Sequence, residues 1–112
     1  MDYPVPELID RAAIFAIKVE NGLPLESQRD LFFKAVPLTE IKNYQTLVKI
    51  HSKIWNKEEE ITASYAKKDF ATAGKLYNEI RDLNVVRMKI KNSIGSRYKD
   101  FQDRKNFPTF QR

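Results

Sequence analysis

The sequence contains no cysteine and only one histidine, His51, among its 112 residues. These absences exclude disulfide bonds, thiolate catalysis and the usual cysteine-rich or histidine-rich zinc sites, and we expect no metal and no other cofactor. No apolar run approaches the roughly 20 residues that span a membrane, and the first residues lack the basic and apolar segments of a secretory signal. The sequence therefore predicts a cytoplasmic protein with no membrane partner.

Glycine is also scarce, with three residues, and the chain has five prolines. The prolines stay outside the long stretches in which apolar residues recur every three or four positions, as is typical of helical proteins. A chain of this length forms one small domain, and its core is thin because short chains bury a smaller fraction of their surface. We therefore expect self-association, as a homo-oligomer, to supply part of the stability.

The periodic stretches predict an all-α protein, an antiparallel bundle of three main helices with a short extra helix and a C-terminal extension. The first long helix opens at Pro6 and ends at Asn21-Gly22, and the short helix or turn follows before Pro37. The bundle is expected to comprise residues 1–95, and the extension residues 96–112.

Two residues have the side chains and positions of helix caps. Thr39 is the expected N-cap of the second long helix, and Asp69 is the expected N-cap of the third. Lys67 and Lys68 lie at the end of the second helix, where a positive charge favours the helix dipole. The third helix is expected to end or bend near Gly95.

Polar residues interrupt the apolar stripe of the second long helix. His51, Trp55 and Glu58 are four and three residues apart, so they share one helical face. The third long helix carries Asn84 and Arg87 on its own inward stripe. An antiparallel packing would bring the two stripes together, so these residues predict a shared polar layer.

Two interpretations of this polar layer are open. In the first, Arg87 binds Glu58 or Glu59, His51 and Tyr77 join them, and the layer fixes the register of the helices. In the second, the same face lines a pocket in which His51 acts as a general base and the glutamates hold a cation. We favour the first, since no nucleophile stands at a suitable spacing, and we assign no catalytic residue.

Three segments carry the most distinctive patterns, P-E-L-I-D-R-A-A-I-F-A-I-K-V-E at 6–20, I-W-N-K-E-E-E-I at 54–61 and Y-N-E-I-R-D-L-N-V-V-R-M-K-I-K-N-S-I at 77–94. Together they resemble a group of small bacterial and phage helical proteins catalogued as domains of unknown function. The resemblance implies a helical bundle with recurring polar positions, and it implies no activity. Those positions are Asp10, Arg11, Lys18, Glu20, Trp55, Glu58, Glu59, Asn84, Arg87 and Lys91.

The positive charge is concentrated at the end of the chain. Residues 81–112 hold nine Lys or Arg against three Asp or Glu, whereas residues 1–80 hold 11 against 12. Cations alternate with aromatic residues in the extension, a pattern that fits contact with an acidic protein or a single-stranded nucleic acid. In the competing interpretation, Tyr98 and Phe101 pack back on the bundle, or Phe107 and Phe110 dock on a second subunit. We favour docking of these rings over nucleic-acid binding. The candidate cations are Arg97, Lys99, Arg104 and Lys105.

Enzyme motifs are weak or missing. The sequence has no phosphate-binding glycine loop, nucleophile elbow or H-E-x-x-H motif. Glu7-x-x-Asp10 and Glu79-x-x-Asp82 are poor counterparts of the paired motifs with which helical nucleotide pyrophosphatases bind magnesium. The sequence therefore favours a non-catalytic interaction or assembly protein. The alternatives are a nucleic-acid-binding accessory protein that uses the basic extension, and a metal-dependent hydrolase of nucleotide pyrophosphatase type.

Overall fold

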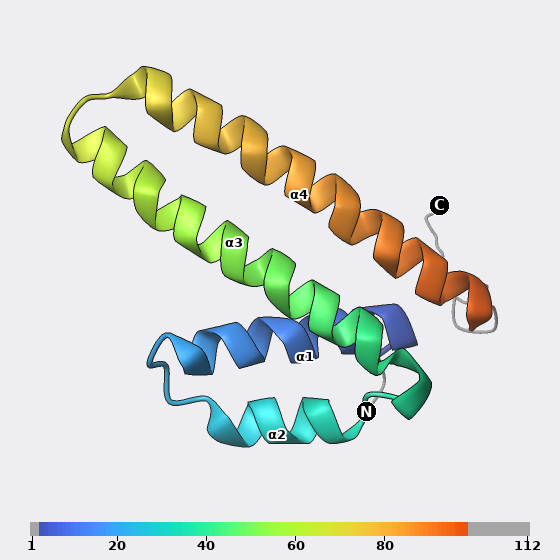
Figure 1. The fold of residues 1–112 in the computed structure, drawn as a ribbon. Helices are drawn as coiled ribbons and strands as arrows, with labels where there is room; N and C mark the ends of the chain where they lie inside the picture. The colour runs from blue at the N-terminus through green and yellow to red at the C-terminus, as the bar shows by residue number, and fades with distance from the viewer. Residues whose placement is uncertain (1–2, 99–112) are drawn as a thin grey trace.

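The computed structural model describes residues 3–98, which form four α-helices, one 3-10 turn and no strand. The expected all-α bundle is therefore confirmed. In chain order the elements are α1 (Val5–Glu20), α2 (Glu26–Lys34), η1 (Leu38–Glu40), α3 (Ile41–Ala66) and α4 (Phe70–Arg97). The two longest helices, α3 and α4, form an antiparallel hairpin (Figure 1).

The helix α1 begins and ends where the sequence predicts. Pro6 lies in its first turn, where a missing N–H is tolerated. At the other end, the side-chain amide of Asn21 donates to the carbonyl oxygen of Ile17 at 2.8 Å, which satisfies one of the free carbonyls there. Gly22 follows with a φ of 94°, a conformation that favours glycine and turns the chain toward α2.

The start of α3 differs from the prediction. Thr39 was expected to cap this helix, but Leu38–Glu40 form a 3-10 turn and the N-cap residue is Glu40. The Glu40 carboxylate makes no capping hydrogen bond, because it accepts hydrogen bonds from Arg97 and Asn43 instead. The helix therefore begins after a turn that a side chain of α4 holds in place.

The turn between α3 and α4 is short, and Asp69 caps α4 as predicted. The Asp69 carboxylate accepts hydrogen bonds from the Thr72 N–H at 3.2 Å and from the Thr72 hydroxyl at 2.7 Å. Just before it, Lys68 has a φ of 59°, the one positive value at a non-glycine residue within residues 3–98. Lys67 and Lys68 are both exposed at this tip of the hairpin.

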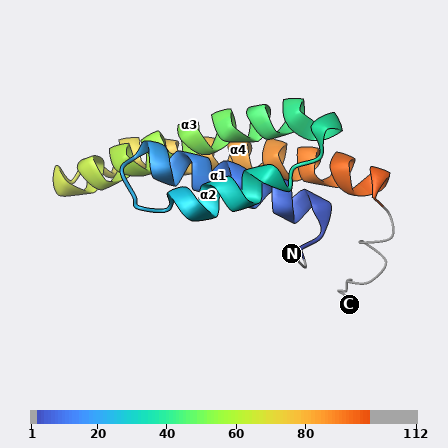
Figure 2. The same cartoon turned by 90° about the horizontal axis from the view of Figure 1, so that it is seen from below.

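Three helices meet near the base of the hairpin. The helix α1 crosses one face of the hairpin, and α2 packs on the outer side of α1 (Figures 1 and 2). Burying apolar side chains at this crossing is the main favourable contribution to the fold. The buried core consists of Leu8, Ile9, Ala12, Ala13, Phe32, Val36, Leu47 and Ile94.

The hairpin continues beyond α1 as a two-helix projection (Figure 1). We call this part, residues 59–80, the arm. Four side chains are buried between its two helices, Ile61, Ser64, Ala73 and Leu76. Within the described chain, α3 and α4 of the arm therefore cover each other and are covered by no third helix.

The helix α4 passes the boundary that the sequence places after residue 95. It ends at Arg97, and Tyr98 packs against the core, as one interpretation of the extension expects. Phe101, Phe107 and Phe110 lie outside the described residues. The division into residues 1–95 and 96–112 stays a prediction, because residues 99–112 lie outside the described part of the chain. Among the helices of residues 3–98, none combines the length and the apolar character needed to cross a membrane.

Candidate functional site

Asp10 lies at the centre of a charged cluster where α1 meets the hairpin. Its side chain has an exposed fraction of 0%. Arg87 of α4 donates from Nε to both carboxylate oxygens, at 3.0 and 3.2 Å, and from Nη2 to Oδ2 at 2.7 Å. His51 of α3 places Nε2 2.8 Å from Oδ1, and it donates because a carboxylate can only accept. One buried carboxylate thus joins three helices.

Further polar groups complete the cluster. The Lys91 Nζ lies 3.5 Å from Asp10 Oδ2 and donates to Glu7 Oε2 at 2.9 Å. Asn84 accepts a hydrogen bond from Arg87 Nη1 at 3.0 Å. Each charged group in the cluster therefore has a partner of opposite sign, as a buried charge requires.

The surroundings of Asp10 keep it ionised. Burial alone would raise the pKa of Asp10, but the hydrogen bonds from His51 and Arg87 and the positive charge of Lys91 outweigh it. The pKa of Asp10 therefore lies well below its ordinary value of 3.8. The same contact raises the pKa of Arg87. A carboxylate so strongly held as an anion suits an anchor and not a group that exchanges protons near neutral pH.

A cavity of about 240 Å³ lies beside the cluster, between α1 and α3. Its wall is mostly apolar, and charged side chains from both helices reach it. His51 belongs both to the cluster and to this cavity. The lining residues are Ile14, Ile17, Lys18, His51, Ile54, Trp55 and Glu58.

The predicted polar positions therefore separate into two adjoining groups. The cluster gathers Asp10, His51, Asn84, Arg87 and Lys91. The cavity gathers Lys18, Trp55 and Glu58 beside His51. Of the other predicted positions, Arg11 lies next to the cluster, with Nε 3.2 Å from Glu7 Oε1, and Glu59 lies at the start of the arm.

The predicted pairing of Arg87 with Glu58 or Glu59 is wrong. Arg87 binds Asp10, whereas Glu58 and Glu59 are exposed. Tyr77 is also outside the polar layer, with an exposed fraction of 52%. The reason is that α1 crosses the hairpin at the level of Arg87 and brings Asp10 there, so the partner of Arg87 comes from the first long helix and not from the second.

A second buried carboxylate, Glu40, was missed from the sequence. It is 2% exposed and accepts hydrogen bonds from Arg97 Nε at 2.9 Å and Nη2 at 2.8 Å. Arg97 lowers the pKa of Glu40, and it is not a free cation of the extension as predicted. The signal in the sequence was an isolated acid just before a long helix, where the helix N-terminus favours negative charge.

The weak magnesium motifs are engaged in ion pairs. Glu79 accepts from Lys57 Nζ at 2.8 Å, and Glu7 accepts from Lys91. Residues 3–98 contain no group of three or more acidic or histidine side chains placed to hold a metal ion. The other cations predicted for the extension, Lys99, Arg104 and Lys105, lie outside the described residues.

The stripe that meets α1 continues onto the arm. Residues seven positions apart lie on nearly the same side of a helix. Two such series run from the base of the hairpin to its tip. The series on α4 is Lys91, Asn84, Tyr77 and Phe70. The series on α3 is His51, Glu58 and Tyr65. The members nearest the base meet α1, whereas the aromatic members on the arm have no third helix to cover them.

These aromatic side chains form an exposed surface, which we call the arm face and define as Tyr65, Phe70 and Tyr77. Their exposed fractions are 49%, 60% and 52%. The rings of Tyr65 and Phe70 contact each other edge to face, with centroids 5.6 Å apart. Next to them, a shallow hollow of about 190 Å³ is lined by Trp55, Glu58, Glu59 and Thr62.

Known proteins provide no further guide to this site. No family model, no curated protein and no solved structure matches the chain. The resemblance to small bacterial and phage helical proteins stays a prediction. What the chain does must therefore be inferred from the cluster, the cavity and the arm face.

Proposed function

We propose that the chain is a non-catalytic assembly protein of the cytoplasm, which forms a homodimer through the arm face. The observation that carries the proposal is the exposure of three aromatic side chains on the side of the hairpin that α1 covers elsewhere. An amphipathic helix is stabilised when its apolar stripe packs against another element. A second arm would supply two such helices and complete a four-helix bundle.

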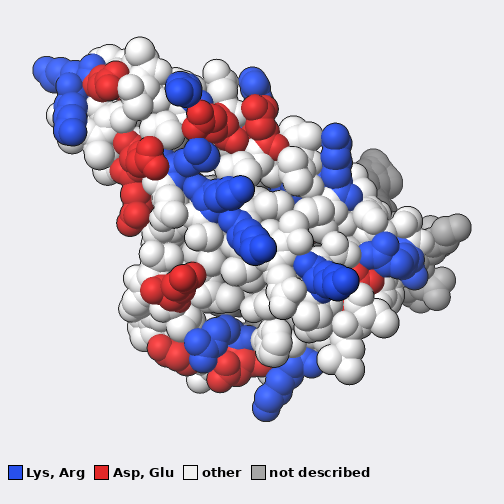
Figure 3. Space-filling model, viewed as in Figure 1, with Lys and Arg blue, Asp and Glu red and all other residues white. Residues whose placement is uncertain are grey.

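The charges along the arm favour a second copy as the partner. Lys67 and Lys68 are exposed at the tip, and Glu59 is exposed where the arm begins. In Figure 3, blue atoms mark the tip and red atoms lie on the edge between the tip and α1. If two arms pack antiparallel about a two-fold axis, the basic tip of each lies over Glu59 of the other.

The charged cluster supports the non-catalytic part of the proposal. Both oxygens of Asp10 already accept hydrogen bonds from Arg87, and one also accepts from His51. The Asp10 side chain is also fully buried, so a substrate does not reach it from solvent. The buried layer instead holds three helices in register, a role that buried polar residues have in helical bundles.

Light scattering after size-exclusion chromatography tests the proposal. The full chain, freed of nucleic acid, is run over a range of concentrations at low and high salt, beside Phe70→Ser/Tyr77→Ser. We expect the wild type to elute as a dimer at both salts, with a dissociation constant that rises modestly with salt as the ion pairs are screened. The double variant is expected to elute as a folded monomer, since both side chains are exposed in a single chain.

Two single variants serve as matched controls. Val85→Ser removes a half-exposed apolar side chain from α4 outside the arm face, and Leu38→Ser removes the most exposed large apolar side chain of the described residues, at 88%. Both are expected to leave the dimer intact. A wild type that is monomeric at every concentration contradicts the proposal, as does a control variant that dissociates like Phe70→Ser/Tyr77→Ser. A monomeric wild type from which nucleic acid could be removed during purification only at high salt would support the nucleic-acid-binding alternative instead.

A further inference from the structure

We propose that the cavity between α1 and α3 binds a small hydrophobic zwitterion of the α-amino-acid type. This inference concerns a ligand site and does not depend on the dimer. Three isoleucines and the indole of Trp55 line the cavity, and they can enclose an aliphatic or aromatic side chain. At about 240 Å³ the cavity is smaller than the usual range for drug-sized ligands, so its size suits one amino acid.

Charges of both signs reach this apolar cavity. Lys18 comes from α1 and Glu58 from α3, and neither forms an ion pair within residues 3–98. Lys18 instead extends near the Phe15 ring, with Nζ 5.8 Å from the centroid. Two opposite charges that share a cavity without neutralising each other fit a ligand that carries both, with its carboxylate at Lys18 and its ammonium at Glu58.

His51 gives the cavity a fixed polar group. Its ring is held at Nε2 by the buried carboxylate of Asp10, and its side chain is only 11% exposed. A ring held in this way can contact a polar group of the ligand without first losing conformational freedom. The charged cluster thus has a second consequence, because it positions one wall of the cavity.

Trp55 is the remaining unusual residue. Its indole N–H is buried and has no hydrogen-bond partner among the described residues, an arrangement that disfavours folding. The ring nevertheless lines the cavity, where its face supplies apolar contact. A tryptophan with an unpartnered N–H lowers stability, so its presence at this cavity is consistent with a role in ligand binding.

The only tryptophan of the chain therefore reports directly on the site. The experiment titrates the wild type with L-leucine, which does not absorb where indole does, and follows Trp55 fluorescence and the indole N–H resonance. We expect a saturable change with a dissociation constant below about 1 mM, within reach of a ligand of this size. 4-Methylpentanoate lacks the ammonium group and 3-methylbutylamine lacks the carboxylate, and each is expected to bind at least about tenfold more weakly, as loss of one charge-assisted contact predicts.

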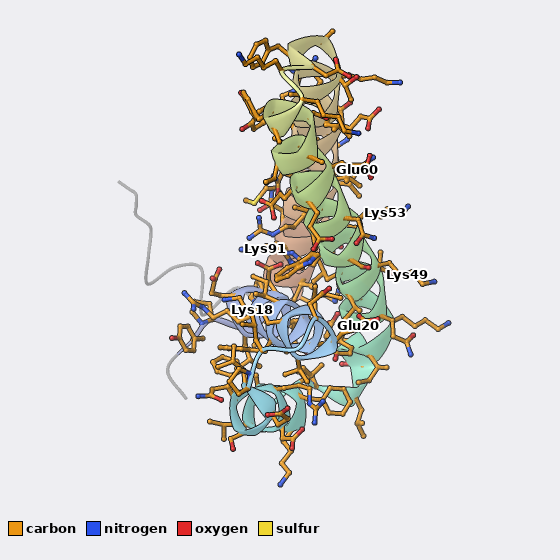
Figure 4. All side chains as sticks on the ribbon, turned by 90° about the vertical axis from the view of Figure 1, so that its left-hand side faces the viewer. Lys18, Glu20, Lys49, Lys53, Glu60 and Lys91 are labelled. Atoms are coloured by element: carbon orange, nitrogen blue, oxygen red, sulfur yellow. The ribbon has the colours of Figure 1, made fainter. Side chains whose placement is uncertain are left out.

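Substitutions on the two walls identify the site. Lys18→Met and Glu58→Gln are each expected to weaken L-leucine binding by about tenfold or more, because each removes one charge of the pair. Lys49→Met and Glu60→Gln are the matched controls, since these side chains project from α3 on the side away from Lys18 (Figure 4). Both controls are expected to bind like the wild type.

Several results would overturn the ligand site. One is the absence of any saturable change in both signals, and another is an unchanged affinity in Lys18→Met and Glu58→Gln. Equal binding of 4-methylpentanoate would overturn the assignment of a zwitterion. The titration is repeated on Phe70→Ser/Tyr77→Ser, so that loss of the dimer and loss of ligand binding are observed separately.

Discussion

The two halves of the α3–α4 hairpin share one repeat and differ in chemistry. Near the base, the positions that meet α1 hold His51, Asn84 and Lys91, and their polar groups join the cluster around Asp10. On the arm, the same stripe holds Tyr77 and other aromatic residues that remain exposed. The stripe is thus polar where α1 packs on the hairpin and supplies a buried countercharge. It is aromatic on the arm, where no third helix packs on it.

Substitutions at the base are expected to lower the free energy of unfolding more than substitutions on the arm. Among them, Arg87→Met should have the largest effect. The variant replaces the guanidinium-bearing side chain with an uncharged, apolar one. The buried Asp10 carboxylate then lacks its bidentate partner. Removing one member of a buried ion pair lowers the free energy of unfolding by about 3–5 kcal/mol. Urea denaturation at neutral pH measures this loss.

The control for that measurement is Arg81→Met, which removes an exposed arginine from the same helix, directly next to the arm. The Arg81 side chain is 69% exposed, so the free energy of unfolding should change by no more than about 0.5 kcal/mol. Similar losses for the two arginine variants would show that Asp10 does not depend on Arg87, and the contrast between base and arm would fail.

The second prediction concerns the pH dependence of the cluster. The pKa of Asp10 is lowered in the folded state, so its contribution to stability is present above its ordinary pKa of 3.8 and is lost as pH falls toward the folded value. At pH 6, Asp10→Asn should unfold more easily than the wild type by on the order of 2 kcal/mol. The difference should shrink steadily below about pH 4. A difference that stays constant from pH 6 to pH 3 would contradict a charged anchor.

The third prediction compares the two halves by amide hydrogen exchange. In Phe70→Ser/Tyr77→Ser, where no second arm is present, amides near Ile61 and Leu76 should exchange faster than those near Leu47 and Ile94. The reason is that two helices cover the arm whereas three meet at the base. In the wild type at high concentration, the proposed dimer should reduce this difference. Equal exchange rates along the monomeric hairpin would argue that the arm is as stable as the base.

The smallest effect is expected at the tip of the arm. Asp69→Ala removes the acceptor for the Thr72 N–H, so the first turn of α4 should fray and its amides should exchange faster. Rates at the base should stay unchanged, because the tip lies at the far end of the hairpin. An increase throughout the chain would mean that the hairpin unfolds as one unit.

Most of the fold follows from local patterns in the sequence. The apolar periodicity predicts the three long helices, and the turn at Gly22 and the cap at Asp69 are visible as residue types with known local preferences. The error at Thr39 has a tertiary cause, because Arg97 holds Glu40 and moves the start of α3 by one residue. Local propensity carries no information about such a distant partner.

The membership of the cluster was easier to predict than its contacts. Arg87 was recognisable from its place on the inward stripe of the third long helix, whereas Asp10 and Lys91 were named only through the resemblance to small helical proteins. Their partners depend on the angle at which α1 crosses the hairpin, and that angle is set by packing at residues such as Ala12 and Ile94. A one-turn change in that crossing would bring another residue of α1 opposite Arg87, so spacing along the chain was insufficient.

The left-handed backbone at Lys68 carries one more consequence. A lysine there has a Cβ atom that this conformation disfavours, whereas glycine would adopt it freely. Lys68→Gly should therefore raise the melting temperature of the monomer. If the charge at the tip contributes to pairing between copies, the same change should weaken the dimer, so the variant would be more heat-resistant and less able to assemble. A lysine at this position would then lower the stability of the monomer and strengthen its association with a second copy of the chain.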